Sequence, residues 1–379
     1  MPWKESTTMS SRLEFVMLAR APKANIAALC RAFQVSRKTA YKWLERYEAL
    51  GAEGLSDQSR KPRSSPASSS DELELQVLAL HLEYPYWGAR KLRELLPDYL
   101  PRPHHSTVDS ILKRHSCKVL GAPVKQELAS TRFEHDQPNS LWQMDFKGHF
   151  ALTTEAAGRC HPLTVLDDHS RFSLCLTAFA NERSSSVQAG LQATFERYGL
   201  PDRITCDNGP PWGSTGLKGL TKLEVWLIRL GIRFSHSRPY HPQTQGKDER
   251  FHRTLQLELL DRRGFGSIEQ CQHAFDEWRE RYNMVRPHHA LDMQPPITRY
   301  QRSGRELPNA LQPIEYLSSD AVRKVDLKGY IGYANRRHYI GEGLQGQAVA
   351  IRPDPETDGL LEVRFCHHKV TQLDLKSLP

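Results

Sequence analysis

The sequence predicts a multidomain α/β protein, with helical units first, a mixed α/β core in the middle and a small β-rich unit last. Three observations favour this order. Apolar residues recur at helical spacing through roughly the first 115 positions. From about position 140, strand-like and helix-like runs follow one another in the order β-β-β-α-β-α-β-α. After Asp320, short strand-like runs are separated by glycine turns.

Composition sets limits on the class of protein. A chain of 379 residues suits two to four domains, and its formal net charge is +8. Residues 1–70 carry 12 Lys and Arg against 6 Asp and Glu, which favours a polyanionic partner such as nucleic acid. No apolar run approaches the length of a membrane span, and the first residues do not resemble a secretory signal. The seven cysteines form no C-x-x-C pair, so we expect a protein of the reducing cytoplasm.

Residues 1–54 are predicted to form a helix-turn-helix domain. One short helix ends near Phe33, and Ser36 is a suitable N-cap for the next. On that second helix, Ala40 and Trp43 share a face that we expect to be buried. Its N-terminal half is where a recognition helix presents side chains to the major groove. The candidate DNA contacts there are Arg37, Lys38, Thr39 and Lys42. The alternative is a solvated basic helix in a small bundle.

Residues 55–71 are predicted to form a linker, because serine, proline and basic residues cannot build a core. Arg60, Lys61 and Arg63 are placed to follow a phosphate backbone or enter a minor groove. Solvated linker charge explains these residues almost equally well.

Residues 72–120 indicate a second helix-turn-helix or winged-helix-like domain, and 121–139 a second linker. Its last helix is expected to begin at Ser106 as the N-cap and to pack through Val108 and Ile111. Ser106, Thr107 and Lys113 are the candidate DNA contacts of this unit. His104 and His105 have no partners at metal-ligand spacing, so we expect loop residues or phosphate contacts.

The core, residues 140–300, places three acids in three separate settings. Asp145 alternates with apolar residues on a predicted strand, Asp207 follows a short buried strand, and Glu249 opens an amphipathic helix. The carboxylates of three such residues suit Mg²⁺, which prefers oxygen ligands, and a pair of such cations promotes in-line displacement at phosphorus. Taken singly, each acid is more simply a turn residue or a solvated side chain.

The segments around these acids are L-W-Q-M-D-F, R-I-T-C-D-N-G and Q-T-Q-G-K-D-E-R, and Y-N-x-x-R-P-H-x-x-L follows them. They resemble the catalytic core of bacterial insertion-sequence DDE transposases, which share it with retroviral integrases. The resemblance implies an RNase H-like fold in which Asp145, Asp207 and Glu249 are catalytic and hold two Mg²⁺, or Mn²⁺, ions. Asp248 is the rival of Glu249, and 41 residues separate Asp207 from Glu249 where about 35 are usual.

The same resemblance implies an activity. The chain would be a DNA transposase that binds terminal inverted repeats, cleaves the element's ends to 3′-OH and joins them to target DNA by two-metal-ion phosphoryl transfer. It would act at the nucleoid on double-stranded DNA, as a homodimer or larger assembly. Lys247, Arg250 and Arg253 suit phosphates near the cut site. The alternatives are a DNA-binding regulator with an unused integrase-like core and a structure-selective nuclease of the same fold.

Three further predictions concern a pair of acids in the core, a Gly-rich stretch and the C-terminal region. Asp167 and Asp168 end a strand, where structural use is favoured over a role in the site. The Gly-rich stretch that contains Trp212 is a plausible DNA contact. Residues 320–379 hold five or six short strands, which suits a small SH3-like β-barrel.

Overall fold

The computed structural model describes residues 7–58, 69–120, 134–153, 158–207, 211–212, 219–236, 246–357 and 359–374. The chain divides into two compact units, Met1–Ser69 and Ser70–Pro379. Arg60, Lys61 and Arg63 of the predicted linker lie outside the described residues. Within those ranges, no helix combines the length and apolar character needed to cross a membrane.

The first unit is built from helices α1 (Thr8–Ala19), α2 (Ile26–Ala32) and α3 (Arg37–Leu50), followed by the 3₁₀ turn η1 (Gly51–Leu55). Helix α3 begins where predicted, because the Ser36 hydroxyl accepts a hydrogen bond from the Thr39 amide at 3.1 Å. Its apolar face is buried against α1 and α2 in a core of Phe15, Val16, Cys30, Ala40, Trp43 and Leu55. The predicted burial of Ala40 and Trp43 is therefore confirmed.

The second unit opens with another helical group, α4 (Asp71–Glu83), α5 (Ala89–Glu94) and α6 (His105–Arg114). Helix α6 starts earlier than predicted. His104 is its N-cap, with its Nδ1 accepting from the Ser106 amide at 3.4 Å, so the prediction of Ser106 as the cap is wrong. The physical reason is that an imidazole nitrogen serves as a hydrogen-bond acceptor, as a hydroxyl does. Val108 and Ile111 are buried as expected.

The core contains a mixed sheet. Its strands within the described residues are β1 (Trp142–Phe146), β2 (Phe150–Ala151), β3 (Arg159–Asp167), β4 (Ser173–Phe179), β5 (Arg203–Cys206) and β6 (Arg233–His236). They follow the order β2-β3-β1-β5-β6, with β4 paired to β3. Pairing of β1 with β3 and of β3 with β4 is antiparallel, whereas β5 is parallel to both β1 and β6.

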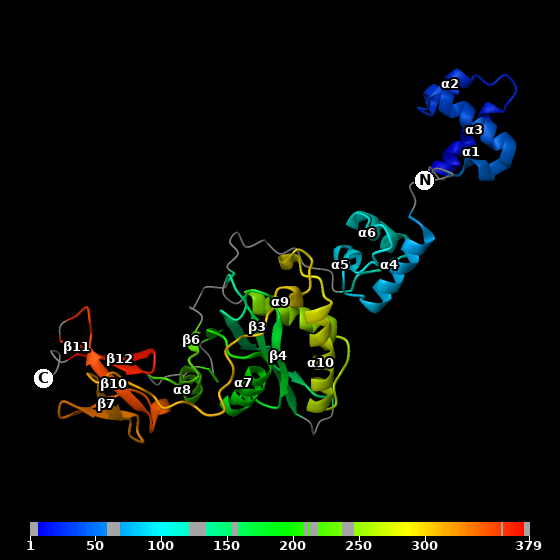
Figure 1. The fold of residues 1–379 in the computed structure, drawn as a ribbon. Coiled ribbons are helices and arrows are strands. Elements are labelled where there is room, and N and C mark those ends of the chain that lie inside the picture. Colours follow the sequence, from blue (N-terminus) through cyan, green and yellow to red (C-terminus); the bar gives the residue numbers. More distant parts are fainter. Residues whose placement is uncertain are drawn as a thin grey trace. The chain divides into compact units, whose positions relative to one another are not determined.

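Helices cover both faces of this sheet (Figure 1). One face packs against α7 (Ser184–Tyr198) and α8 (Lys222–Arg229). The other packs against α9 (Gly246–Leu255), the π-helical turn η3 (Gln256–Leu260) and α10 (Ile268–Met284). Apart from the two-residue strand β2, the element order is the one predicted for the RNase H-like core. Helix α7 ends at Gly199, where φ is +79°, as the glycine predicted.

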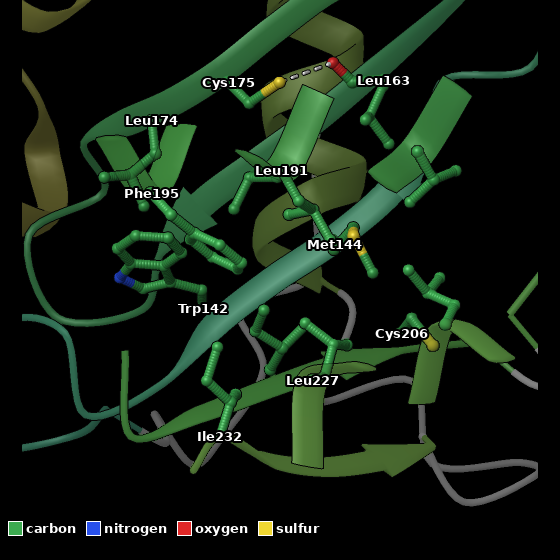
Figure 2. Close-up of a cluster of buried hydrophobic side chains, with 14 of the residues drawn as sticks. Trp142, Met144, Leu163, Leu174, Cys175, Leu191, Phe195, Cys206, Leu227 and Ile232 are labelled. Carbon is green, nitrogen blue, oxygen red and sulfur yellow. Dashed lines mark hydrogen bonds between the residues drawn. The ribbon is translucent and has the colours of Figure 1, made fainter. Parts of the chain in front are cut away.

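The first face buries the apolar side of β1. Figure 2 shows Trp142 and Met144 on that side of the strand, with Leu191 and Phe195 of α7 nearby. Trp142 and Met144 are 0% and 1% exposed. Because side chains alternate along a strand, Gln143 and Asp145 must project from the opposite side of β1, towards α9. The core therefore fixes which way Asp145 faces.

The C-terminal region is β-rich. Among the residues described there, β12 (His368–Asp374), β11 (Leu360–Phe365), β10 (Ala348–Pro353) and β7 (Ala321–Lys324) form one sheet, and β8 (Tyr330–Tyr333) pairs with β9 (Arg336–Tyr339). These strands pack on Val225 and Ile228 of α8. The prediction of a small β-rich unit is confirmed. The described strands form a sheet and a separate hairpin rather than a closed barrel.

Candidate active site

The parallel pairing of β1 with β5 brings Asp145 and Asp207 together. In this pairing Trp142 lies opposite Ile204 and Gln143 opposite Thr205. Asp145 and Asp207 each follow two residues later, so they lie at the same level of the two neighbouring strands. With a side-chain period of two, both project from the same face as Gln143 and Thr205. Asp145 and Asp207 thus lie close together although they are 62 positions apart in the sequence.

Helix α9 supplies the third acid. Phe251 and Leu255 are buried among β-strand residues and α10, which holds the helix against the face from which Asp145 projects. Glu249 lies in the first turn of α9 and is exposed, whereas the preceding Asp248 is buried. The predicted buried stripe of the helix, which continues to Leu259, is confirmed.

Electrostatics link the three acids. Burial raises the pKa of Asp145 to about 7, and the negative charges of Asp207 and Glu249 act in the same direction. Because the charges of Asp207 and Glu249 act on Asp145, a cation bound among the three carboxylates would be stabilising. The donor set, three carboxylates with no thiolate, is the one that Mg²⁺ or Mn²⁺ prefers. The residues present therefore fit a divalent metal site.

A histidine that the sequence interpretation missed lies beside Asp145. His252 Nε2 is 2.8 Å from the Thr164 hydroxyl, which donates its proton to the main-chain oxygen of Asp145 at 2.9 Å. The other ring nitrogen, Nδ1, lies 3.9 Å from Asp145 Oδ2. Burial, with the nearby Lys147, lowers the pKa of His252 to about 3, so the ring is neutral. Its spacing from Glu249, three residues on a helix, was the available signal.

A buried ion pair fastens the start of α9. The ammonium group of Lys247 contacts the carboxylate of Asp168, whose side chain is fully buried. Asp168 also accepts from Gln143 Nε2 at 2.7 Å and from the His135 amide at 2.9 Å. The neighbouring Asp167 accepts from the amides of Ser170 and Asn139, both at 2.7 Å, which shapes the turn after β3. Both aspartates thus have structural contacts.

The candidate DNA contacts within the described residues fall into three groups. On α3, Arg37, Lys38 and Lys42 are exposed, and Thr39 is half-buried, its hydroxyl 2.9 Å from that of Ser36. Lys42 also lies over the ring of Trp43, 4.4 Å from its centroid. Around the acids, Arg250 is exposed, Arg253 is half-buried, and Lys247 is held by Asp168. The remaining candidates are on α6, where Ser106 and Lys113 are exposed and Thr107 is half-buried.

Trp212 and Arg286 are both held by structural contacts. Trp212 is 1% exposed and stacks on Phe146, with ring centroids 5.4 Å apart, so the expectation that it contacts DNA is wrong. Its large apolar surface is buried in the core. Arg286, in the R-P-H motif, donates from Nε to Glu258 at 2.9 Å. Glu258 also accepts from the indoles of Trp87 and Trp278, so Arg286 braces the core and the α4–α6 group.

Family models match most of the chain in separate segments. The integrase core domain matches residues 135–242 and 230–296. A helix-turn-helix domain matches residues 11–63, and a homeodomain-like domain matches 39–112. The C-terminal domain of the IS481 family transposases matches residues 320–378. The order of these segments agrees with the order of the structural units.

Curated relatives come from mobile elements. The chain is 25% identical over 269 residues to the insertion element IS476 uncharacterized 39.2 kDa protein of Xanthomonas euvesicatoria, covering 69% of this chain and 74% of that one. It is 22% identical over 256 residues to the insertion element IS407 uncharacterized 31.7 kDa protein of Burkholderia multivorans, covering 66% and 89%. A 198-residue stretch is 28% identical to the Gag-Pol polyprotein of Baboon endogenous virus, covering 48% of this chain and 10% of the polyprotein.

Solved structures similar to the chain include two viral integrases. One is the HTLV-2 integrase catalytic core domain in complex with magnesium, at 16% identity and a TM-score of 0.34, covering 44% of this chain and 99% of that chain. The other is the simian T-cell lymphotropic virus intasome, at 18% identity and a TM-score of 0.38, covering 76% and 95%. The integrase-core and IS481-type domains and the insertion-element relatives together support an insertion-sequence transposase with an integrase-type core.

Proposed function

We propose that this transposase binds the terminal inverted repeats of its element, cleaves each end to a 3′-OH and joins that hydroxyl to target DNA. The observation that carries the proposal is the grouping of Asp145, Asp207 and Glu249, in which the negative charges of Asp207 and Glu249 act on Asp145. A binding protein has no need of three carboxylates gathered at one place. Both reactions are in-line displacements at phosphorus, so one site can serve both.

In this proposal Asp145, Asp207 and Glu249 hold two Mg²⁺ ions, with Mn²⁺ as a substitute. When bound, the ions supply activation of the attacking oxygen and stabilisation of the leaving one. The protein side chains orient the site: Thr164 holds His252 beside Asp145, and the Lys247–Asp168 pair fixes the first turn of α9. Arg250 and Arg253 flank Glu249 on that helix and would bind phosphate oxygens near the cleaved bond.

End recognition is assigned to the helical units. Arg37, Lys38, Thr39 and Lys42 on α3 and Ser106, Thr107 and Lys113 on α6 would read or position the inverted repeat, and Arg60, Lys61 and Arg63 would follow its backbone. Two ends joined to one target imply at least a dimer. The C-terminal strands would contact DNA or a second subunit.

The test is a strand-transfer assay with Mg²⁺, labelled element-end DNA and a supercoiled target, comparing the wild-type chain with Glu249→Gln. Joined product from the wild type alone supports the proposal. If both proteins bind the end tightly and neither cuts nor joins it, the chain is a DNA-binding regulator with an unused core. Equal joining by both proteins would remove Glu249 from the site.

A further inference from the structure

A second group of metal-binding side chains lies at the edge of the core sheet. His149 follows β1, His161 is on β3, and Glu182 follows β4. One ligand atom of each residue lies within 4.8 Å of those of the other two. His161 Nδ1 is 2.8 Å from Glu182 Oε1, and the imidazole centroids of His149 and His161 are 5.3 Å apart. None of the three belongs to the proposed DDE site.

Strand pairing fixes this arrangement. In the antiparallel pairing of β2 with β3, Phe150 lies opposite Cys160, so the next opposed pair along the ladder is His149 and His161. Directly opposed residues on antiparallel strands have Cβ atoms about 4.5 to 5.5 Å apart. On the other side of β3, His161 lies opposite Phe179 of β4, and Glu182 follows three residues later. The three side chains are therefore held together by neighbouring strands.

The donor set differs from that of the three acids. Two imidazoles and one carboxylate suit Zn²⁺ and similar transition metals, whereas Mg²⁺ prefers oxygen ligands alone. Zinc ligands lie about 2.0 to 2.2 Å from the ion, so tetrahedral ligand atoms are about 3.4 Å apart. The observed spread of up to 4.8 Å closes by rotation of His149, which is exposed, while His161 and Glu182 are half-buried and already in contact.

One neighbour opposes a cation. Arg159 Nη1 lies 2.8 Å from His149 Nε2, so the guanidinium occupies one nitrogen of that ring. Arg159 is exposed and can move into solvent when an ion enters. Removing the positive charge of Arg159 should then strengthen metal binding, whereas removing a ligand should weaken it.

We propose that His149, His161 and Glu182 form a binding site for a zinc-like transition-metal ion, separate from the proposed catalytic carboxylates.

The experiment is a calorimetric titration of the full chain with Zn²⁺, supported by the visible absorption of bound Co²⁺. We expect His161→Ala and His149→Ala each to weaken Zn²⁺ binding at least about tenfold, and Arg159→Ala to strengthen it. Asp145→Asn should bind Zn²⁺ like the wild type. A matched control is His273→Ala, since His273 is an exposed histidine that pairs with Glu277 on α10.

Circular dichroism checks that each variant is folded, and Glu182→Gln, which keeps the shape of the side chain, replaces any histidine variant that is not. The proposal is overturned if His161→Ala and Glu182→Gln bind Zn²⁺ as tightly as the wild type. It is also overturned if binding is lost only in Asp145→Asn, since the ion would then occupy the carboxylate site. Because the readout is binding, the result does not depend on whether the chain cleaves DNA.

Discussion

Asp248 and Glu249 are consecutive residues of α9 with opposite environments. Asp248 is 4% exposed, and its Oδ1 accepts no hydrogen bond from the part of the chain that the structure describes, whereas Glu249 is exposed. Burial, together with the charges of Asp145 and Asp168, raises the pKa of Asp248 well above its usual range. A protonated, buried carboxyl is a poor metal ligand, so the geometry favours Glu249 over its neighbour.

This difference predicts opposite results for two substitutions of nearly equal shape. Glu249→Gln should lower strand transfer at least about a hundredfold, because it removes a charged metal ligand. Asp248→Asn should retain most of the activity, because Asp248 is expected to be neutral already. Both are measured in the Mg²⁺ strand-transfer assay, with end binding as the control for folding. The reverse result would identify Asp248 as the ligand.

The ion pair between Lys247 and Asp168 predicts a loss of stability when one partner is removed. Lys247→Met leaves the fully buried carboxylate of Asp168 without its cation, which should lower the free energy of unfolding by about 3 kcal/mol. Adding Asp168→Asn removes the uncompensated charge and should restore most of the loss. Urea denaturation of the single and double variants measures both changes. Equal stability of Lys247→Met and wild type would contradict the burial of the pair.

His288 predicts sensitivity to acid. Burial lowers its pKa well below the usual range, and the nearby cations Arg286, Lys91, Arg171 and Arg250 act in the same direction. His288 is then protonated in the unfolded chain but stays neutral in the folded chain. The free energy of unfolding therefore falls as the pH drops below about 6.5. His288→Phe removes this contribution and should flatten the dependence by up to about 1.4 kcal/mol per pH unit. The measurement is the midpoint of urea unfolding between pH 7 and 5. Parallel curves for the two proteins would show that His288 is not the source.

Helix α3 predicts the salt dependence of end binding. Arg37→Ala or Lys38→Ala should weaken binding and reduce the slope of log K against log salt by about 1 for each phosphate that the variant no longer binds. Arg302→Ala is the charge-matched control, since Arg302 is an exposed arginine of the second unit that pairs with Glu306. Fluorescence anisotropy at several salt concentrations gives both quantities. If the α3 variants have the same slope as the wild type and differ in no way from Arg302→Ala, the phosphate-binding residues lie elsewhere.

Much of the fold could be predicted from local patterns. The cap at Ser36, the glycine that ends α7 and the apolar stripe of α9 each depend on residues close in sequence, and each is confirmed. The prediction for Trp212 is wrong because a residue distant in sequence determines its environment. Trp212 lies in a Gly-rich stretch, a pattern that favours an exposed loop at a DNA surface, yet Phe146, from a strand far earlier in the chain, buries it.

Some residues of the candidate site could likewise be predicted from local sequence, and others could not. The three acids could be proposed because each lies in its own sequence context, and the position of Asp145 follows from strand alternation alone. His252 and the Lys247–Asp168 pair were missed because their significance depends on contacts across 88 and 79 positions. A helix spacing of three from Glu249 was a signal for His252, but no local pattern indicates that Thr164 would contact its imidazole.

The level pairing of Asp145 with Asp207 has a consequence for insertions and deletions. Side chains along a strand alternate with a period of two, so one residue inserted between Arg203 and Asp207 would turn the carboxylate to the opposite face of the sheet. One residue inserted after Asp207 but before α8, or between β6 and α9, changes only the length of a connection. The 41-residue interval between the second and third acids can therefore change in length at these two connections, whereas the four residues of β5 cannot.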